Sequence, residues 1–406
     1  MKKLFVLCLS AIISFFVILT GCTQKTNNES GGKTTLKMLV PGYEGGYLKK
    51  ELDSGISAFE KENPNTKIEI ISVGWEELNS KIVQLYQAGE APDIMLTGSR
   101  TLKQLADMGA AEDLSNYITD TFKSNRVENV LDTAKIDGKQ FGIPMAFSSR
   151  ALYYRSDLIT TPPTTWDELL STAIEVHTKN NISGFAIPTD LTSGTDEILN
   201  FIYQNNGRIV DEKGNFVINS KENIETVDFL KKFTKAGIPD PVSTSRSDQV
   251  TLFKNGKLAM FVSGPWEKEE LDKGIEKTPY KVAVLPKGKV SAETLVTDSY
   301  VISSKSTNKE MAWKFVEFMG QPEYQRPVSE AFGWFPILKA EENDERFKSE
   351  FMKPFAESIK YGVTEPHVPN WDEFNKSFIT AIQKALTNQS DSKSALDLSQ
   401  IELNKK

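Results

Sequence analysis

The sequence predicts an α/β protein in which helices cover both faces of a mainly parallel sheet. Strand candidates at 35–41, 67–73 and 94–96 alternate with amphipathic helix candidates at 47–63 and 75–88, and this alternation is typical of the α/β class. The chain has 406 residues, which is enough for two globular domains with cores of their own. Its hydrophobic and charged fractions, 39% and 25%, are ordinary for a soluble protein.

The loops after these strands are where we first expect a ligand, because parallel sheets bind ligands beyond the carboxyl ends of their strands. Tyr43 and Glu44 follow the first strand candidate, and Arg100 lies in the loop after the third. We therefore expect these three side chains at the ligand-binding edge of the sheet.

The middle and end of the chain continue the alternation of strands and helices. The passage 138–154 holds two extended runs broken at Pro144, and it could carry the chain from one lobe into another. Thr165 is a plausible N-cap for the helix that follows. Apolar runs and helical periodicity predict strands at 185–188, 258–262, 280–286 and 297–302, a hairpin over 207–218, helices at 196–205, 223–236, 267–273 and 309–319, and a mostly helical tail over 347–386.

The first 21 residues are typical of an export signal. Lys2 and Lys3 precede an apolar run over 4–19, which is too short to span a membrane comfortably as a permanent helix. The run ends in the tetrapeptide LTGC, which resembles the bacterial lipoprotein signal and makes Cys22 the diacylated first residue of the mature chain. A plain secretory signal with an incidental cysteine is the alternative. Residues 22–35 are almost entirely polar, so we expect a flexible tether there.

The cysteine count and the charge exclude several classes of function. Cys8 and Cys22 are the only cysteines, so cleavage before Cys22 leaves the folded body without a disulfide or a thiol nucleophile. The formal net charge of −7 becomes more negative once the two lysines of the signal are removed. An acidic exported body argues against nucleic acid as a partner.

An enzyme would need a constellation of catalytic groups, and the sequence offers none. Neither His177 nor His367 has metal-ligand partners at a recognised spacing, and no Gly-x-Ser-x-Gly motif is present. We therefore expect no metal, no cofactor and no enzymatic activity. A surface glycan hydrolase built on two carboxylates is a weaker alternative.

Trp266 stands at an unusual point of the sequence. The predicted strand 258–262 is stopped by Ser263, Gly264 and Pro265, and the indole follows at the mouth of the next helix. An indole in this position either caps the core beneath the helix or offers a flat face to a ligand.

Three further aromatic residues, Tyr43, Trp334 and Trp371, also follow turns or strand ends. In an exported protein without catalytic groups, such aromatics suit a cleft that stacks flat apolar faces. We interpret Trp75, Trp166 and Trp313, which lie in helical patterns, as packing residues.

A set of segments in a fixed order carries a resemblance to a known family. They are Gly89 to Asp93 (GEAPD), Gly142 to Leu158, Pro163 to Asp167 (PTTWD), Asn206 to Asp211 (NGRIVD), and the run from Phe253 to Trp266 that ends in Gly-Pro-Trp. Together they resemble the extracellular solute-binding proteins of family 1, the sugar-binding lipoproteins of ABC importers and relatives of maltose-binding protein. The resemblance covers essentially the whole mature chain.

The resemblance implies a two-lobed, type II periplasmic-binding-protein-like fold with a ligand cleft between the lobes and a hinge near Pro144 and Ser299. One lobe would take 34–144 plus 300–330, and the other 148–298 plus 331–390. It also implies a monomer on the extracytoplasmic face of a bacterial cell membrane, which delivers a carbohydrate to ABC permease subunits with a separate ATPase.

The resemblance identifies Trp266 as the stacking tryptophan and puts Trp371 where relatives carry another aromatic. Ser148 stands where maltose binders have glutamate, and Thr97 replaces one of their aromatics, so maltose itself is not the expected ligand. The expected ligand-binding residues are Tyr43, Glu44, Arg100, Ser148, Arg150, Trp266, Trp334 and Trp371.

A binder of a non-sugar solute, such as a polyamine, is the competing interpretation. Glu44 and Asp298 would match the positive charges of a polyamine, whereas Arg100 and Arg150 would oppose them. A carbohydrate, and in particular an oligosaccharide, is the favoured ligand.

Overall fold

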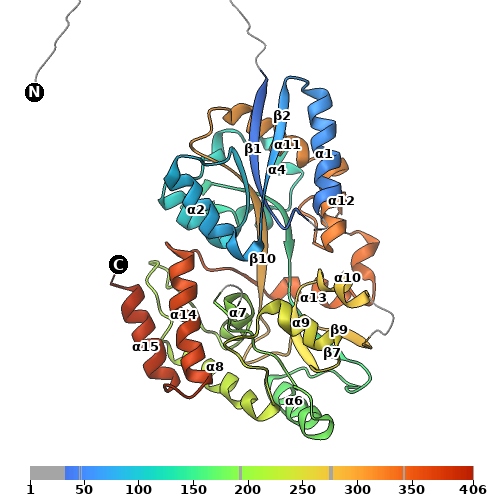
Figure 1. The fold of residues 1–406 in the computed structure, drawn as a ribbon, viewed down its shortest axis with the longest axis vertical. Helices are drawn as coiled ribbons and strands as arrows, with labels where there is room; N and C mark the ends of the chain where they lie inside the picture. Colours follow the sequence, from blue (N-terminus) through green and yellow to red (C-terminus); the bar gives the residue numbers. More distant parts are fainter. Residues whose placement is uncertain are drawn as a thin grey trace, which may run out of the picture.

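One long strand, β10 (Glu293–Ile302), runs through the middle of the molecule and joins its two lobes (Figure 1). The computed structural model describes residues 33–405 except 45, 47, 192–193, 274–277 and 342, and leaves out the side chains of residues 146 and 332. The predicted signal peptide, Cys22 and most of the predicted tether lie outside the described residues.

The upper lobe in Figure 1, called lobe 1 below, is built on a mixed sheet with the strand order β11-β10-β3-β1-β2, and β6 pairs with β10. Strand β1 is parallel to β2 and β3, as the sequence predicts, while β10 runs antiparallel to β3 and β6. The strands that belong to lobe 1 here are β1 (Thr34–Pro41), β2 (Thr66–Val73), β3 (Ile94–Gly98) and β6 (Ile143–Ser148). The short strand β11 (Gly362–Thr364) pairs with Glu293–Leu295 at the start of β10, where β10 meets α7 (Gly194–Gln204) of the lower lobe.

Helices cover both faces of this sheet because its strands are apolar on both sides. Successive side chains of a strand point to opposite faces. Leu36, Met38 and Val40 of β1 pack into one core, whereas Leu39 packs into another. The first core is closed by α1 (Leu48–Glu62), α11 (Lys309–Met319) and α12 (Pro322–Phe332), and the second by α2 (Leu78–Ala88) and α3 (Leu102–Asp107).

The lower lobe, lobe 2, holds a three-stranded antiparallel sheet with β7 in the centre and many helices around it (Figure 1). Its strands are β7 (Ala151–Arg155), β8 (Met260–Ser263) and β9 (Tyr280–Ala283). Its helices are α6 (Trp166–Asn180), α7 (Gly194–Gln204), α8 (Lys221–Lys231), α9 (Arg246–Lys254), α10 (Glu267–Asp272), α13 (Lys353–Ser358), α14 (Trp371–Leu386) and α15 (Ser392–Leu403).

Short elements complete the described part of the chain. They are α4 (Asp120–Ser124), α5 (Glu128–Asp132), β4 (Lys135–Ile136), β5 (Lys139–Gln140), and the 3₁₀ turns η1 (Trp75–Glu77), η2 (Ser99–Thr101), η3 (Leu114–Asn116), η4 (Lys232–Ala236), η5 (Lys339–Glu341), η6 (Glu345–Lys348) and η7 (Ile359–Tyr361). None of the helices in the described ranges is long and apolar enough to cross a bilayer.

Most of the hydrophobic clusters lie within one lobe, while one cluster joins Val130 of lobe 1 to Phe253 and Phe261 of lobe 2, and core membership changes along the chain near Ser148, near Ser299 and near Trp334. The two-lobed α/β fold is therefore as expected. We keep the finer limits, 34–144 plus 300–330 and 148–298 plus 331–390, as a proposal. The last helix, α15, extends past residue 390 and packs against α14.

Three predicted elements differ from the structure. The predicted hairpin over 207–218 forms no regular strands, and its two arms meet only at an isolated bridge between Val210 and Phe216. The segment 185–188 is extended but forms no regular strand; Ala186 N–H donates to the carbonyl of Met260 at 3.2 Å, and Pro188 has no N–H to continue the ladder. The predicted helix 75–88 begins with the 3₁₀ turn η1 before α2 continues it. The sequence reading also missed α9, α12 and β11, which are short or carry a proline inside the helix.

Candidate functional site

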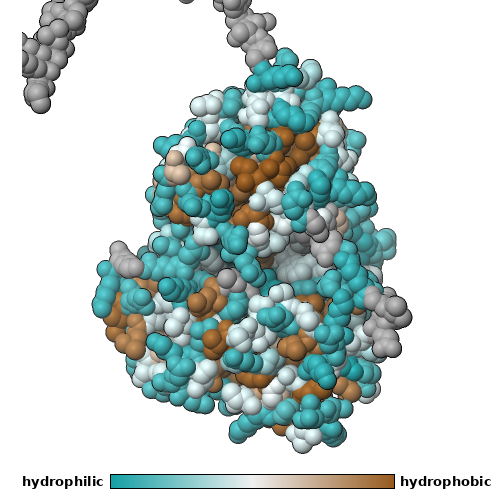
Figure 2. Space-filling model, viewed as in Figure 1, coloured by the Kyte–Doolittle hydropathy of each residue, from teal (hydrophilic) through white to brown (hydrophobic). Residues whose placement is uncertain are grey.

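A cavity of about 650 Å³ lies between the two lobes, lined by residues of both. Figure 2 shows the surface drawn in at this waist, bordered mainly by hydrophilic residues. Lobe 1 and the strands at the waist contribute Gly42, Glu44, Gly46, Trp75, Glu76, Arg100, Ser148, Val296, Asp298 and Trp334, while lobe 2 contributes Arg150, Asp196, Arg246, Ser247, Val250, Thr251, Trp266, Glu267 and Glu270.

The upper wall is built by loops at the carboxyl ends of three neighbouring strands. Glu44 follows β1, Trp75 follows β2 and Arg100 follows β3, which is the edge where such sheets bind ligands. Gly42 has φ of +63°, and a Cβ there would lie 2.7 Å from Nε1 of Trp75. A glycine is therefore required where the first loop passes the indole.

Trp266 enters the cavity from the lower wall, immediately before α10. Its Nε1–H donates to Oε1 of Glu267 at 2.8 Å, and the same oxygen accepts from Ser263 at 2.7 Å. The indole folds back over Gly264, where a Cβ would lie only 2.1 Å from the ring. The Gly-Pro-Trp sequence thus fixes the ring with a backbone contact and a hydrogen bond, and leaves it half-buried in the lining.

Arg150 lies beneath the same indole and is almost fully buried. Its guanidinium carbon is 4.9 Å from the centre of the Trp266 ring, and its Nε forms an ion pair with Glu197 at 3.3 Å. One face of the indole is therefore covered by a cation. Nη1 of Arg150 is buried and has no hydrogen-bond partner among the described residues, so it can donate to a ligand oxygen.

The first turn of α7 supplies the acids that hold the arginines of the lower wall. Asp196 accepts from Nη2 of Arg246 at 2.9 Å, and Glu197 forms an ion pair with Nε of Arg246 at 2.9 Å. Both carboxylates lie at the positive end of the helix, which favours negative charge. Burial alone would raise the pKa of Asp196, but Arg100, Arg246 and Arg150 hold it below its ordinary value.

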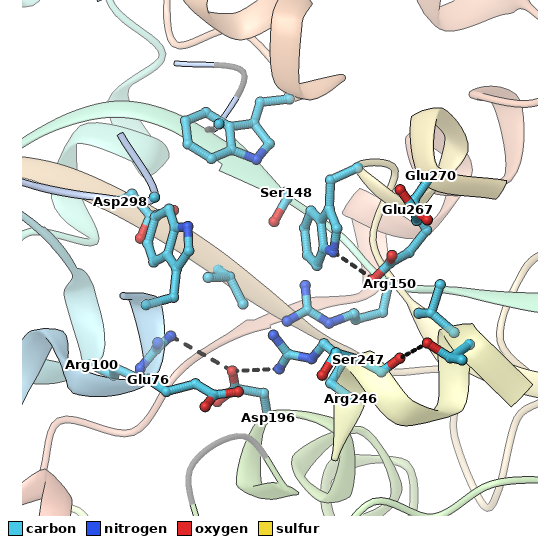
Figure 3. A pocket seen from close by; sticks show the side chains of 18 of the residues that line it. Glu76, Arg100, Ser148, Arg150, Asp196, Arg246, Ser247, Glu267, Glu270 and Asp298 are labelled. Atoms are coloured by element: carbon cyan, nitrogen blue, oxygen red, sulfur yellow. Dashed lines mark hydrogen bonds and ion pairs between the residues drawn. The ribbon is translucent and has the colours of Figure 1, made fainter. Parts of the chain in front are cut away.

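Arg100 connects lobe 1 to lobe 2. Its Nη1 donates to Oε1 of Glu365 at 3.0 Å and lies 3.8 Å from Oδ2 of Asp196, and Figure 3 shows Arg100, Asp196 and Arg246 in a row joined by dashed lines. Burial lowers the pKa of Arg100, but Asp196 and Glu365 outweigh that effect and raise it. The guanidinium therefore stays charged and neutralised by acids of the opposite lobe.

Asp298 is the buried carboxylate of the waist, with 9% of its surface exposed. It lies on β10 next to an irregular point of the pairing with β6, where Met145 of β6 is the extra residue between the pairs Asp298–Ala146 and Ser299–Pro144. Burial raises the pKa of Asp298 to about 6, with a smaller rise from Asp196 and an opposing effect of Arg100. Burial likewise raises the pKa of Glu365 to about 7, against the effect of Arg100.

Of the eight residues expected to bind ligand, six line this cavity: Glu44, Arg100, Ser148, Arg150, Trp266 and Trp334. Tyr43 does not, because its side chain turns away into the core of lobe 1. It is 6% exposed, donates its hydroxyl proton to Asp53 and accepts from Lys49 at 3.0 Å.

Trp371 also lies outside the lining and begins α14. Its ring is 6% exposed, packs edge-on against Phe374 with centroids 5.5 Å apart, and lies under Arg100, whose guanidinium carbon is 5.6 Å away. Its backbone N–H donates to Gln104 of lobe 1 at 3.2 Å. The residue therefore sits behind Arg100 rather than in the lining.

Trp75, interpreted from the sequence as packing, is 38% exposed and lines the cavity. The packing interpretation of Trp75 was based on helical periodicity. A better indication of its role in the site is its position just after β2, which corresponds to the position of Glu44 just after β1. Trp166 does pack in the core: its ring stacks on Phe229 at 4.4 Å. Trp313 is 7% exposed in the core of lobe 1.

Five charged lining residues had no signal of their own in the sequence: Glu76, Glu270, Asp196, Arg246 and Glu267. Each lies in or beside a helix start that reads as an ordinary solvated turn. Only the packing of α7, α9 and α10 around one cavity brings the last three together.

Comparison with known proteins gives a consistent result. Residues 45–326 match the family described as bacterial extracellular solute-binding proteins. A protein of Brucella abortus (strain 2308), provisionally named a binding protein, is 30% identical over 338 residues, which is 80% of this chain and 82% of that protein. The galactooligosaccharide-binding protein of Bacillus subtilis (strain 168) is 24% identical and covers 98% of this chain and 95% of its own length.

Solved structures agree with the two-lobed fold. An ABC substrate-binding protein from Listeria monocytogenes in complex with cycloalternan has a TM-score of 0.82 and 26% identity, and covers 92% of this chain and 98% of its own. Maltose-bound T. maritima MalE3 has a TM-score of 0.80 and 24% identity, over 91% of this chain and 99% of its own.

Proposed function

This chain belongs to the family of bacterial extracellular solute-binding proteins, and we propose that it captures a carbohydrate in the cleft between its lobes. The observation that carries the proposal is a lining that mixes indoles with hydrogen-bonding groups. Trp75, Trp266 and Trp334 offer flat apolar surface, while Ser148 and the free Nη1 of Arg150 offer donors.

A sugar ring has the matching chemistry. Its C–H groups form an apolar face that stacks on an indole, and its hydroxyls form a polar rim that needs donors and acceptors. A volume of about 650 Å³ is within the range of roughly 300–1,000 Å³ that small-molecule sites occupy. Relatives named for a galactooligosaccharide and for maltodextrin support an oligosaccharide as the ligand.

A polyamine is the second candidate ligand. The charges found in the cleft are more compatible with a polyamine than the sequence analysis indicated. Arg100 and Arg150 were expected to repel a polycation, but Glu365, Asp196 and Glu197 neutralise them. The carboxylates of Glu44, Glu76 and Asp298 line the same cavity. A ligand with positive charge is therefore compatible with the site.

A thermal-shift screen over mono- and oligosaccharides, spermidine and putrescine tests the proposal. A ligand at 100 times its Kd should stabilise the folded state by about 2.7 kcal/mol, and at least one carbohydrate should do so. Trp266→Ala, measured against the same panel, is the control for binding in the cleft. Stabilisation by polyamines alone would contradict the carbohydrate proposal and leave the second candidate.

We also propose that Cys22 carries a lipid anchor on the extracytoplasmic face of the cell membrane, and that a monomer delivers its ligand to an ABC permease without a catalytic step of its own. The support is the LTGC tetrapeptide after a charged start and an apolar run. Metabolic labelling with a fatty acid should mark the wild type and not Cys22→Ala. A labelled variant would contradict the anchor.

A further inference from the structure

We propose that the carbohydrate bound by this cleft carries an amino group, and that the carboxylate of Asp298 is the counter-ion of its ammonium. This inference rests on the proposed carbohydrate function and names the class of ligand.

Asp298 has no direct ion-pair partner among the described residues of the cleft. Its side chain lines the cavity while 9% of its surface is exposed. Within the described residues, its carboxylate makes no hydrogen bond and no ion pair, and its pKa is raised mainly by burial. An isolated buried carboxylate costs free energy that a positive partner recovers. Asp298 lies beside an irregularity in the β6–β10 pairing, and its side chain is among those that line the cavity.

The arginines of the cleft do not supply that partner. Arg100 pairs with Glu365 at 3.0 Å, Arg246 with Asp196 at 2.9 Å, and Arg150 with Glu197 at 3.3 Å. Each guanidinium thus has an acid of its own. Arg100 and Arg150 act on Asp298 only from beyond ion-pair distance, so a direct positive partner for this carboxylate would come from the ligand.

Two further carboxylates at the rim of lobe 1 add negative charge to the cleft. Glu44 and Glu76 line the cavity, are exposed, and form no ion pair within the ranges that the structure describes. Carboxylates in a cleft with low-dielectric walls raise the local concentration of cations. The faces of the Trp75 and Trp266 indoles add a weaker attraction for an ammonium.

The combination of groups points to an amino sugar rather than a simple amine. Indoles on both walls of the cleft suit the C–H face of a pyranose, and Nη1 of Arg150 can donate to a ring hydroxyl oxygen. The ammonium would then meet Asp298. The carboxylates of the cleft would repel the carboxylate of a sugar acid, so we expect sugar acids not to bind.

Isothermal titration with matched ligands tests the inference. The pairs are glucosamine and glucose, galactosamine and galactose, and the chitosan disaccharide and cellobiose. The members of each pair differ only by an amine against a hydroxyl at C2, at one ring in the monosaccharides and at both rings in the disaccharide. N-acetylated chitobiose, glucuronate and spermidine are further arms. At least one amino sugar should bind about tenfold or more tighter than the matching hydroxyl sugar. Only the ammonium can form a buried ion pair and a charge-assisted hydrogen bond with Asp298.

Asp298→Asn identifies the residue that reads the charge. The variant should bring the affinity ratio of the amine to the hydroxyl sugar close to one, because a neutral amide cannot pair with an ammonium. Asp132→Asn, on the surface of lobe 1, removes the same charge outside the cavity and should leave the ratio unchanged. The melting temperature of apo Asp298→Asn should not fall, because the change removes a buried unpaired charge.

The outcomes separate this inference from the proposed function. A neutral sugar that binds as tightly as its amine partner overturns the inference and leaves carbohydrate binding in place. Failure of every amino sugar to bind overturns it as well. Binding of spermidine alone overturns both. If the affinity ratio of the amine to the hydroxyl sugar is unchanged in Asp298→Asn, Asp298 is not the counter-ion of the ammonium.

Discussion

At the scale of single residues, three tryptophans show how one side chain type takes different roles in this chain. Trp75 is 38% exposed in the cleft, Trp266 is half-buried on Arg150, and Trp166 stacks on Phe229 with its Nε1–H bound to Gln204 at 2.6 Å. The partners around each indole, rather than the residue type, decide its role.

We expect substitution of these residues to separate binding from stability. Trp75→Ala and Trp266→Ala should each weaken ligand binding by about 2 kcal/mol, as for other buried aromatic anchors. Trp166→Ala should cost roughly 3–5 kcal/mol of unfolding free energy, because it empties a packed core position. Titration calorimetry and denaturant unfolding on the same samples give both quantities. A Trp75→Ala variant that binds normally but unfolds easily would return that residue to a packing role.

Asp298 and Glu365 predict how pH changes the stability of the unliganded protein. Burial raises their pKa values to about 6 and about 7, above the values of about 3.9 and 4.3 in an unfolded chain. A carboxyl group with a raised pKa in the folded state gives stability that is complete below its unfolded pKa and is lost as pH rises through its folded pKa. As pH rises from about 4 to about 7 and these two groups lose their protons, the unfolding free energy of the protein should therefore fall.

The check is the unfolding free energy of the wild type and of Asp298→Asn across that range. The variant has one titrating group fewer, so its stability should fall less steeply with pH. Parallel curves for the two proteins would mean that Asp298 does not titrate as stated.

At the scale of elements, α6 illustrates a helix whose start the sequence predicts correctly. Oγ1 of Thr165 accepts a hydrogen bond from the N–H of Glu168 at 3.3 Å, which satisfies one of the free donors of the first turn. β10 illustrates the opposite case. The apolar run predicts 297–302, whereas the strand begins at Glu293, because its first residues pair with β11.

Thr165→Ala should cost about 1 kcal/mol of unfolding free energy through loss of this cap. Thr178→Ala in the last part of the same helix is the matched control, because its hydroxyl bonds back to the carbonyl of Ile174 and caps no free donor. We expect a change of less than about 0.5 kcal/mol for the control. Equal effects of the two substitutions in denaturant unfolding would argue against the cap.

At the scale of the whole molecule, cores that lie mainly within one lobe and a limited number of chain crossings allow the lobes to move as bodies. Arg100 and the Trp371 N–H to Gln104 bond are contacts between the lobes. Closure about a few residues at such crossings is the motion expected of two-lobed binding proteins. We expect the hinge near Pro144 and Ser299.

Solution scattering should show a smaller radius of gyration at saturating ligand, because the lobes close on it. Trp266→Ala at the same ligand concentration is the control, since it should stay as open as the unliganded wild type. If the wild type saturates in calorimetry and its radius of gyration stays the same, the closure hypothesis fails.

The sequence alone determined the alternation of strands and helices in lobe 1, the Thr165 cap and the loops that line the upper wall. These features depend on local chemistry: side-chain periodicity, caps and the position of a residue just after a strand. The family resemblance added the two lobes and the position of Trp266. Local chemistry and the resemblance together identified eight site residues, of which six line the cavity.

The tertiary structure alone decided which charges meet. Arg100 and Glu365 are 265 residues apart in the chain, and Arg150 and Glu197 come from different elements. The same applies to Tyr43 and Trp371, whose side chains turn into the cores of their lobes, and to Asp298, which lines the cleft. Sequence patterns report on neighbours a few residues away, whereas burial, ion pairing and pKa depend on segments that only the packed fold brings together.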